Sequence, residues 1–375
     1  MIHWRYVTGE SESAARGLAG DEFLMNMYNT WAQDDCPEPT LRIYTFRSHC
    51  ALAGRYENVE AEINLPECRA LGIEVNRRAT GGGAILMGER QLMVTLATSS
   101  EHPIVPFHPA RTLAKMARGV IAGLREMGVD AEYRPKNDIV VGGRKIGGSG
   151  ICIDESGGFM YQASVLLDFD IPLMIRTRRL PIEKVAGKRI QGRSSDDRQE
   201  MVDSFEERIT SVLRETGRDW ETQQAMEAVC RGFEEAFKMS ATHTPFSPVE
   251  MEKIGKLERE KYGCDHWLYL RQPARDMVGE SVKKTPAGLV RAYVSMAGGT
   301  IKNVLITGDF FSGNRAVNDI ESALKWGKTD RESIARCIRV AASAAGGSIQ
   351  GLSSDELAEI VHSAVLSARF DQGDR

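Results

Sequence analysis

Two separated fragments combine runs of glycine with cationic side chains, and both adjoin residues typical of β-strands. The first reads Arg77-Arg78-Ala79-Thr80-Gly81-Gly82-Gly83-Ala84-Ile85, and the second extends from Asn137 to Gly150 and contains Gly142-Gly143-Arg144-Lys145 and Gly147-Gly148-Ser149. Each glycine inside a strand costs about 0.5–1 kcal/mol relative to alanine, so three in succession cost about 1.5–3 kcal/mol. A flexible turn would explain an isolated Gly-Gly pair. The flanking arginines and the second fragment instead favour main chain that approaches a phosphate-bearing ligand.

The pattern of apolar residues predicts strands and helices without a steady alternation of the two. Apolar residues at helical spacing predict helices over 19–32 and 109–127, the second ending before Gly128. Asp138–Val141, the Gly142-Gly143 turn and Lys145–Ile153 predict a β-hairpin. Further strands are expected over residues 41–46, 73–78, 84–87, 91–97 and 159–168. We therefore expect an α+β fold, a mixed β-sheet flanked by helices.

The chain from residue 173 onward contains a basic segment, a predicted domain boundary and a tail of different character. Residues 173–198 are basic and are expected to be irregular, and helices follow over 200–215 and 219–238. The segment from His243 to Pro248 predicts a domain boundary, because proline and small polar residues interrupt the helical pattern there. Beyond it we expect a helix at 249–261, strands at 289–296 and 301–306, and helices at 316–326, 330–344 and 354–368. The expected domains are 1–242, large, and 243–375, small and α+β.

Composition excludes several classes of protein. A net charge of −4 argues against general nucleic-acid binding. The seven cysteines form no C-x-x-C pair and the seven histidines no H-x-x-x-H pair, so reduced thiols are expected rather than disulfides or a transition-metal site. No apolar run approaches the length of about 18 residues that spans a bilayer, and residues 1–5 lack a signal-peptide pattern. We expect a cytoplasmic protein with no membrane or nucleic-acid partner.

Lys145 is the first candidate for a chemical role. Most lysines are solvated surface charges, but this one follows a tight turn and precedes Gly147-Gly148-Ser149-Gly150, which offers little side chain to crowd a ligand. An ammonium there would stabilise negative charge that develops on an acyl carbonyl and a phosphate. Asn137 and Asp138 either form a turn through their side chains, or bind a nucleotide and a Mg²⁺ ion respectively.

At these positions the chain resembles the lipoate–protein ligase A family of the biotin/lipoate ligase superfamily. The resemblance rests on Arg77-Arg78-x-Thr80-Gly81-Gly82-Gly83-Ala84 and on Asn137-Asp138-Ile139 with Gly143-Arg144-Lys145-Ile146-x-Gly148-Ser149. Gly54-Arg55-x-x-Asn58 is similar to the first loop of that family, and Lys184-Val185-Ala186-Gly187-Lys188 to its adenylate-binding loop. Residues 301–311 resemble part of the C-terminal accessory domain of the long ligases.

The resemblance implies a catalytic domain, a C-terminal accessory domain and a two-step reaction. ATP, with Mg²⁺, would activate lipoate or octanoate as an acyl-adenylate. The acyl group would then pass to a lysine of a lipoyl-carrier protein, which would be a lipoyl domain, a carrier like the glycine-cleavage H-protein or a dedicated lipoate-binding protein. Lys145 would polarise the acyl carboxyl group and Asp138 would bind Mg²⁺. The residues implied to bind the acyl group or the adenylate are Arg78, Thr80, Gly81, Gly82, Gly83, Ala84, Asn137, Gly148, Ser149, Lys184 and Lys188.

The chain departs from the family pattern at two places, which leaves acyl preference and carrier identity open. Met87-Gly88 stands where the family has His-Asp, and Tyr161-Gln162 where it has a His-His pair. One alternative is an ATP-independent octanoyl or lipoyl transferase that uses a cysteine nucleophile. No cysteine occurs between Cys68 and Cys152, however, and Ile171-Pro172-Leu173-Met174 offers no thiol. Another alternative is a lipoyl-binding module that has lost catalysis. A biotin ligase is disfavoured, because its Gly-Arg-Gly-Arg-type loop is absent.

The basic run at 176–193 has two interpretations. It is either a solvated loop, or a loop that closes over the adenylate and helps to dock an acidic carrier protein.

Overall fold

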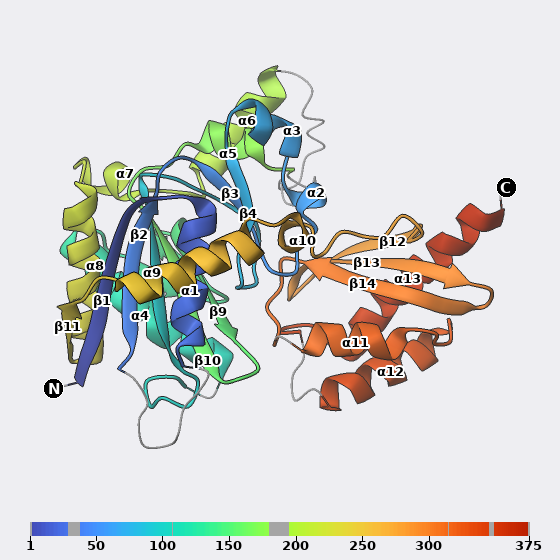
Figure 1. The fold of residues 1–375 in the computed structure, drawn as a ribbon. Coiled ribbons are helices and arrows are strands. Elements are labelled where there is room, and N and C mark those ends of the chain that lie inside the picture. Colours follow the sequence, from blue (N-terminus) through green and yellow to red (C-terminus); the bar gives the residue numbers. More distant parts are fainter. Residues whose placement is uncertain are drawn as a thin grey trace. The chain divides into compact units, whose positions relative to one another are not determined.

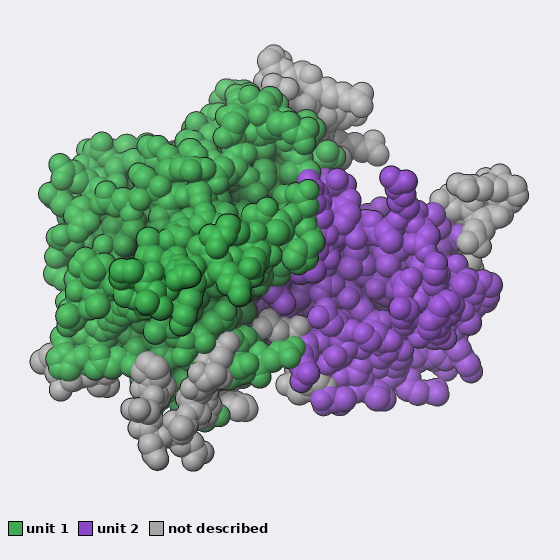
Figure 2. Space-filling model, in the orientation of Figure 1, with its two compact units in different colours: residues 1–52, 63–79, 85–268 green, residues 53–62, 80–84, 269–375 purple. Residues whose placement is uncertain are grey.

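Two units make up the part of the chain that the computed structural model describes, namely residues 2–28, 38–106, 108–179, 195–313, 315–344 and 349–373. Unit 1 contains residues 1–52, 63–79 and 85–268 (Figure 2). Unit 2 contains residues 53–62, 80–84 and 269–375. Two short loops from the N-terminal half of the sequence therefore belong to the same unit as the C-terminal residues.

Unit 1 is built on an eight-stranded mixed sheet with the strand order β11-β1-β2-β6-β10-β9-β8-β7 (Figure 1). Strand β1 runs parallel to β2 and β11, and the remaining neighbours are antiparallel. A smaller sheet has the order β4-β3-β5. The strands are β1 Ile2–Glu12, β2 Thr40–Phe46, β3 Cys50–Ala53, β4 Glu74–Arg77, β5 Ile85–Met87, β6 Gln91–Ser99, β7 Glu132–Arg134, β8 Asp138–Val141, β9 Arg144–Ile153, β10 Gly158–Leu166 and β11 Met239–His243.

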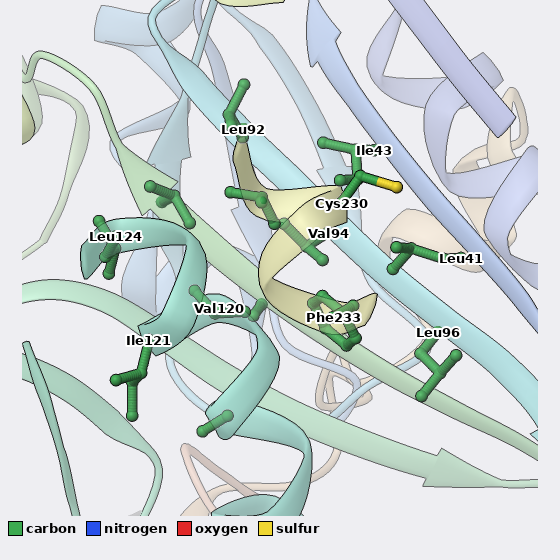
Figure 3. Packing of buried hydrophobic residues seen from close by; sticks show 14 of the residues in the cluster. Leu41, Ile43, Leu92, Val94, Leu96, Val120, Ile121, Leu124, Cys230 and Phe233 are labelled. Atoms are coloured by element: carbon green, nitrogen blue, oxygen red, sulfur yellow. The ribbon is translucent and has the colours of Figure 1, made fainter. Parts of the chain in front are cut away.

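Helices cover both faces of the large sheet. Ile43 and Val94 pack with α4 and α8 on one face (Figure 3). Tyr44 and Met93, one position along each strand, pack with α1 and α9, because neighbouring side chains of a strand point to opposite faces. The helical segments of unit 1 are α1 Ala14–Asn26, α3 Leu65–Ala70, α4 Pro109–Glu126, α5 Ile171–Thr177, α6 Ser195–Glu206, α7 Val212–Thr216, α8 Thr222–Phe237, α9 Pro248–Leu257, the π-helix η2 Glu258–Tyr262 and α10 Asp265–Leu268.

Unit 2 has its own hydrophobic core. Its antiparallel sheet has the order β12-β13-β14, and α11, α12 and α13 supply apolar side chains such as Ile320, Ile338 and Val361 to that core. Tyr56, from the loop of residues 53–62, is a member of the same cluster. The elements are α2 Val59–Glu62, β12 Gly279–Thr285, β13 Gly288–Ala297, β14 Thr300–Gly308, α11 Ala316–Leu324, α12 Arg331–Ala344 and α13 Ser354–Gly373.

The fold class predicted from the sequence is confirmed, since a mixed sheet with flanking helices and a small α+β unit are both present. The strands predicted over 41–46, 91–97 and 159–168 form as β2, β6 and β10, and the hairpin forms as β8 and β9. The helix predicted at 109–127 forms as α4. The three predicted C-terminal helices form as α11, α12 and α13.

Other local predictions were wrong. The irregular segment expected from residue 173 begins inside helix α5, whose N-cap Asp170 accepts a hydrogen bond from the Leu173 amide and which has Pro172 in its first turn. The helix expected at 19–32 begins earlier, at Ala14, and ends at Asn26, and residues 29–32 lie outside the described residues. Strands β1, β3, β7, β11 and β12 were not predicted.

The units divide at other places than the predicted boundary at 242/243. Residues 243–268 belong to unit 1, where Arg5 donates to the Thr244 carbonyl at 3.1 Å and α9 packs against α1. Ser247 and Glu250 form a capping box that starts α9 at Pro248, the last residue of the predicted boundary segment. That residues 1–242 are a catalytic domain and 243–375 an accessory domain stays a prediction. Among the described residues, none of the helices has the length and apolar character required to cross a membrane.

Candidate functional site

The hairpin β8–β9 carries the candidate site of unit 1. Its turn residues Gly142 and Gly143 have φ angles of 54° and 81°, the left-handed region that a two-residue type I′ turn requires. Val140 pairs with Lys145, and a bulge then shifts the register so that Asp138 pairs with Gly148. Asp138 and Val140 share a face, so Lys145 and Asp138 project from the same face of the hairpin.

Lys145 and Asp138 form an ion pair there. Lys145 Nζ lies 2.7 Å from Asp138 Oδ1, and Arg134 Nη2 lies 2.8 Å from Asp138 Oδ2. Partial burial raises the pKa of Asp138, but Lys145 and Arg134 outweigh that effect and bring the pKa below its usual range. The carboxylate is therefore ionised at neutral pH and holds the ammonium of Lys145, whose side chain is 38% exposed.

The main chain of Lys145 is also held by residues outside the hairpin. Its amide donates to the Arg208 carbonyl at 2.7 Å, and its carbonyl accepts from the Thr210 amide at 2.9 Å. The ammonium lies over Gly148, where an added Cβ would come within 2.9 Å of Nζ. Residues 208–210 thus help the hairpin to fix the backbone of Lys145, and Gly148 leaves the space that the Lys145 side chain occupies.

Asn137 and Ser149 close the open end of the hairpin. Asn137 Nδ2 donates to the Ser149 carbonyl at 2.7 Å, and the Ser149 amide donates to the Asn137 carbonyl at 2.8 Å. Ser149 is buried. These contacts give both residues a role in forming the hairpin. Their predicted contact with the adenylate stays a prediction.

Asp138 fits a divalent metal ion poorly in this arrangement. Both of its oxygens are bonded to cationic nitrogens of Lys145 and Arg134, which would repel Mg²⁺. Within the described ranges, no three carboxylate, histidine or cysteine side chains gather as a metal site. Mg²⁺ prefers oxygen ligands, commonly one or two carboxylates together with phosphates. This arrangement favours Asp138 as a counter-ion of Lys145 and Arg134 over Asp138 as a ligand of Mg²⁺.

The glycine triplet lies in unit 2, and the chain's own packing explains two of its three glycines. A Cβ on Gly81 would lie 2.6 Å from the Phe310 carbonyl oxygen. Gly82 has a φ of 93° and donates its amide to that same oxygen at 3.2 Å. At Gly83, in contrast, the nearest atom to an added Cβ would be 3.5 Å away, an ordinary contact. Thr80 and Ala84, at the ends of the loop, are both buried.

The structure brings the predicted residues together in two groups. Asn137, Asp138, Lys145, Gly148 and Ser149 meet on the hairpin of unit 1, and residues 80–84 form one loop of unit 2. Arg78 belongs to unit 1 and donates to the Leu52 carbonyl at 2.7 Å. Lys184 and Lys188 lie outside the described residues.

Sequence reasoning missed Arg134 as a partner of Asp138. Arg134 pairs with Asp138 across the short β7–β8 connection, so a cation just before that turn was the available signal. Gln162, where the family pattern has histidine, donates to Asp21 Oδ2 at 2.7 Å. Asp21 is buried beside Arg42, at 2.7 Å, and also accepts from Tyr44. Gln162 therefore completes a buried polar network.

Four of the described cysteines, Cys50, Cys68, Cys152 and Cys230, are buried and poorly suited to nucleophilic attack. Burial raises the pKa of Cys68 to about 11 and of Cys230 to about 12, and that of Cys50 lies well above its usual range. Cys152 is also buried. The thiolate is the reactive form, so a raised pKa suppresses reactivity at neutral pH.

Comparison with known proteins places the chain in a family. Residues 13–234 match the family model described as lipoyl protein ligase A/B catalytic domain. The chain belongs to that family. Residues 279–361 match a second model, the C-terminus of bacterial lipoate protein ligases. The predicted resemblance is therefore confirmed, and the chain is an enzyme of the lipoate ligase and transferase family, whose chemistry is the modification of proteins with lipoyl or octanoyl groups.

Individual relatives are of two kinds. The octanoyltransferase LipM of Brevibacillus brevis is 26% identical over 290 residues, which are 71% of this chain and 99% of the relative. The structure of P. falciparum LipL1 in complex with lipoate is 15% identical, with a TM-score of 0.72 over 97% of this chain and 99% of that one. A lipoate-protein ligase A solved with bound ATP is 22% identical, with a TM-score of 0.58 over 72% of this chain and 99% of that one. At these identities the two structures show the fold alone.

Proposed function

We propose that this protein activates lipoate or octanoate with ATP and transfers the acyl group to a lysine of a lipoyl-carrier protein. The observation that carries the proposal is the ammonium of Lys145, held 2.7 Å from Asp138 above Gly148 on a hairpin whose backbone is fixed. An acyl-adenylate needs positive charge beside its carbonyl and phosphate oxygens more than it needs a protein nucleophile. An ammonium on a fixed backbone, beside glycines that leave the main chain uncovered, supplies that charge.

In the first step, a carboxylate oxygen of the acid would attack the α-phosphorus of ATP, and the bond to pyrophosphate would break. Lys145 would turn from Asp138 toward the incoming phosphate and acyl oxygens, and would stabilise the negative charge that develops on them. Asp138 would keep Arg134 as its partner, so that its partly buried carboxylate is not left unpaired. Asp138 thus serves as the counter-ion that holds Lys145 in place before the substrates bind.

In the second step, the neutral amine of the carrier lysine would attack the acyl carbon, and AMP would leave with the electrons of the C–O bond. The nitrogen would then lose a proton and the amide would be complete. This chain would contribute the charge of Lys145 and the alignment of the reactants, and no side chain of the protein would become acylated.

A cysteine-dependent octanoyltransferase is the second candidate, because relatives that match across 71% of this chain are named octanoyltransferase LipM. Two observations favour the ligase. Burial raises the pKa of Cys50, Cys68 and Cys230, as described above, whereas a transferase needs a reactive thiolate. The match to the C-terminus of bacterial lipoate protein ligases is the second observation.

Lipoate-dependent exchange of labelled pyrophosphate into ATP tests the proposal. A ligase catalyses this exchange because adenylate formation is reversible, whereas a transferase or a lipoyl-binding module does not. A parallel assay should offer an octanoyl thioester of a carrier protein together with a lipoyl domain, without ATP. Exchange that requires lipoate supports the ligase. Octanoyl transfer without ATP, together with no exchange, would replace it by the transferase.

A further inference from the structure

Tyr56 anchors the loop of residues 53–62 in the hydrophobic core of unit 2. Its ring is 1% exposed and stacks on Phe310, with the ring centroids 5.1 Å apart and an interplanar angle of 20°. The side chain belongs to the same cluster as the apolar residues of β13, β14 and the C-terminal helices. A large aromatic residue of the N-terminal half is therefore part of the C-terminal core.

Polar contacts fix the orientation of that ring. The Tyr56 hydroxyl donates to the Gly313 carbonyl at 3.2 Å, and the Gly308 amide donates to the Tyr56 carbonyl at 2.9 Å. The guanidinium of Arg271 lies 5.5 Å from the ring centroid. Both ends of the tyrosine are thus tied to the segment that surrounds Phe310.

A short, rigid turn connects Tyr56 to Gly54. The Gly54 amide donates to Glu57 Oε2 at 2.8 Å, and the Glu57 amide donates to the Gly54 carbonyl at 3.2 Å. The side chain of Glu57 is fully buried. Because the turn closes on itself, the position of Tyr56 determines the position of Gly54.

The same turn contacts the glycine loop of residues 80–84. The Arg55 amide donates to the Thr80 carbonyl at 2.9 Å. Gly54 approaches Gly82 so closely that an added Cβ would lie 1.9 Å from the Gly82 oxygen. The Gly82 amide in turn donates to the carbonyl of Phe310, the residue on which Tyr56 stacks. One continuous set of contacts joins the buried ring to the main chain of the glycine loop.

We propose that Tyr56 is a positioning residue that shapes the main chain of residues 80–84 for an acyl nucleotide. This inference rests on the proposed function, since it assigns a ligand to that loop. The ring acts through Gly54 and Phe310 and does not touch the reacting atoms. The geometry of the binding loop is consequently set by the core of unit 2.

Hydrogen–deuterium exchange on the full-length protein tests the positioning without any need for activity. We expect Tyr56→Ala to speed amide exchange within residues 80–84 at least tenfold, while residues 145–150 on the hairpin exchange as in the wild type. Ile338→Ala is the matched control, because Ile338 is buried in the same core on α12, which packs against α11 and α13. It should lower Tm comparably without changing exchange in the loop.

Gly54→Ala tests the contact between the loops without touching the core. Its Cβ would clash with Gly82, so exchange within residues 80–84 should again rise at least tenfold. Gly299→Ala is its control in unit 2, since an added Cβ there meets no atom within 4 Å. If Tyr56→Ala fails to fold, Gly54→Ala decides the question. The inference would be overturned if a folded Tyr56→Ala variant exchanged residues 80–84 at the wild-type rate. If Tyr56→Ala does not fold, the same result in Gly54→Ala would overturn it.

Kinetics separate positioning from general stability. In the lipoate-dependent exchange assay, we expect both test variants to raise KM for lipoate at least tenfold, and both controls to keep KM within about twofold of the wild type. An unchanged KM in folded test variants would also overturn the inference. If the wild type shows no pyrophosphate exchange, the proposed function fails, and the deuterium measurements still decide whether Tyr56 positions the loop.

Discussion

Replacing Lys145 with methionine separates the chemistry of the hairpin from its stability. The substitution keeps most of the length of the side chain and removes the ammonium that lies 2.7 Å from Asp138. The Lys145 side chain is 38% exposed, and ion pairs at such positions contribute about 0–1 kcal/mol to stability. Asp138 retains Arg134, so its charge stays paired. We therefore expect the free energy of unfolding to fall by at most about 1 kcal/mol, or about 2–4 °C in Tm.

The expected loss of activity is much larger. A donor aimed at charge that develops in a transition state is worth about 2.7–4 kcal/mol, which corresponds to about 10²–10³ in kcat. We expect Lys145→Met to lower lipoate-dependent pyrophosphate exchange by that factor, as measured beside thermal unfolding of the same preparation. The exposed neighbour Lys136 supplies the matched control, and Lys136→Met should keep wild-type exchange.

Two results would refute this reasoning. If folded Lys145→Met kept more than about a tenth of wild-type kcat, the ammonium would not stabilise the reaction to the extent proposed. If its Tm fell by far more than about 4 °C, Lys145 would be a structural residue, and the lost activity would carry no chemical meaning.

Three further predictions follow from individual contacts. Gly148→Ala places a Cβ 2.9 Å from Lys145 Nζ and should lower the exchange rate by about tenfold with near-native Tm, whereas a wild-type rate would show that the ammonium need not lie there. Cys152→Ala should leave exchange and lipoyl transfer within about twofold of the wild type in steady-state assays, and abolished transfer would indicate a cysteine nucleophile. A hydrogen bond from Arg5 brings the pKa of Glu250 to about 2, so this pair stabilises the fold at neutral pH and loses its effect as the pH falls from 4.5 toward 2. In urea unfolding, Glu250→Gln should cost about 1–2 kcal/mol at pH 7 and progressively less below pH 4.5, and a cost independent of pH would contradict this assignment.

Short-range patterns predicted those parts of the fold that depend on neighbouring residues. The Gly142-Gly143 turn could be predicted from the sequence, because two glycines between apolar runs are typical of a β-hairpin turn with left-handed φ angles. This turn sets the register of the hairpin around Lys145. Helix α4 could also be predicted, because its buried residues, such as Leu113 and Val120, recur at helical spacing.

The pairing of strands that lie far apart in the sequence could not be predicted from local patterns. Strand β1 lies between β11 and β2, and Trp4 and Tyr6 alternate with His3 and Arg5 along it. That alternation was a usable signal for a strand, but nothing local indicates that β1 pairs with Met239–His243 at the other end of unit 1.

The glycine triplet shows most clearly what local sequence cannot predict about a binding site. Its three glycines predicted that another group lies close to the main chain, and the structure has such close contacts at Gly81 and Gly82. The partner, however, is the Phe310 carbonyl of the chain itself. Local sequence does not distinguish a ligand from a distant segment as the group that requires glycine, because both exclude a Cβ in the same way.

Intact mass of a lipoyl domain after incubation with this protein tests the central claim, thiol-independent activation of a free acid by ATP, most directly. The reactions should contain free lipoate with ATP, free lipoate without ATP, and an octanoyl thioester without ATP. We predict that one lipoyl group is added to the domain in the first reaction alone, in the wild type and in Cys152→Ala alike. Acylation in the third reaction alone would contradict the account and identify a transferase.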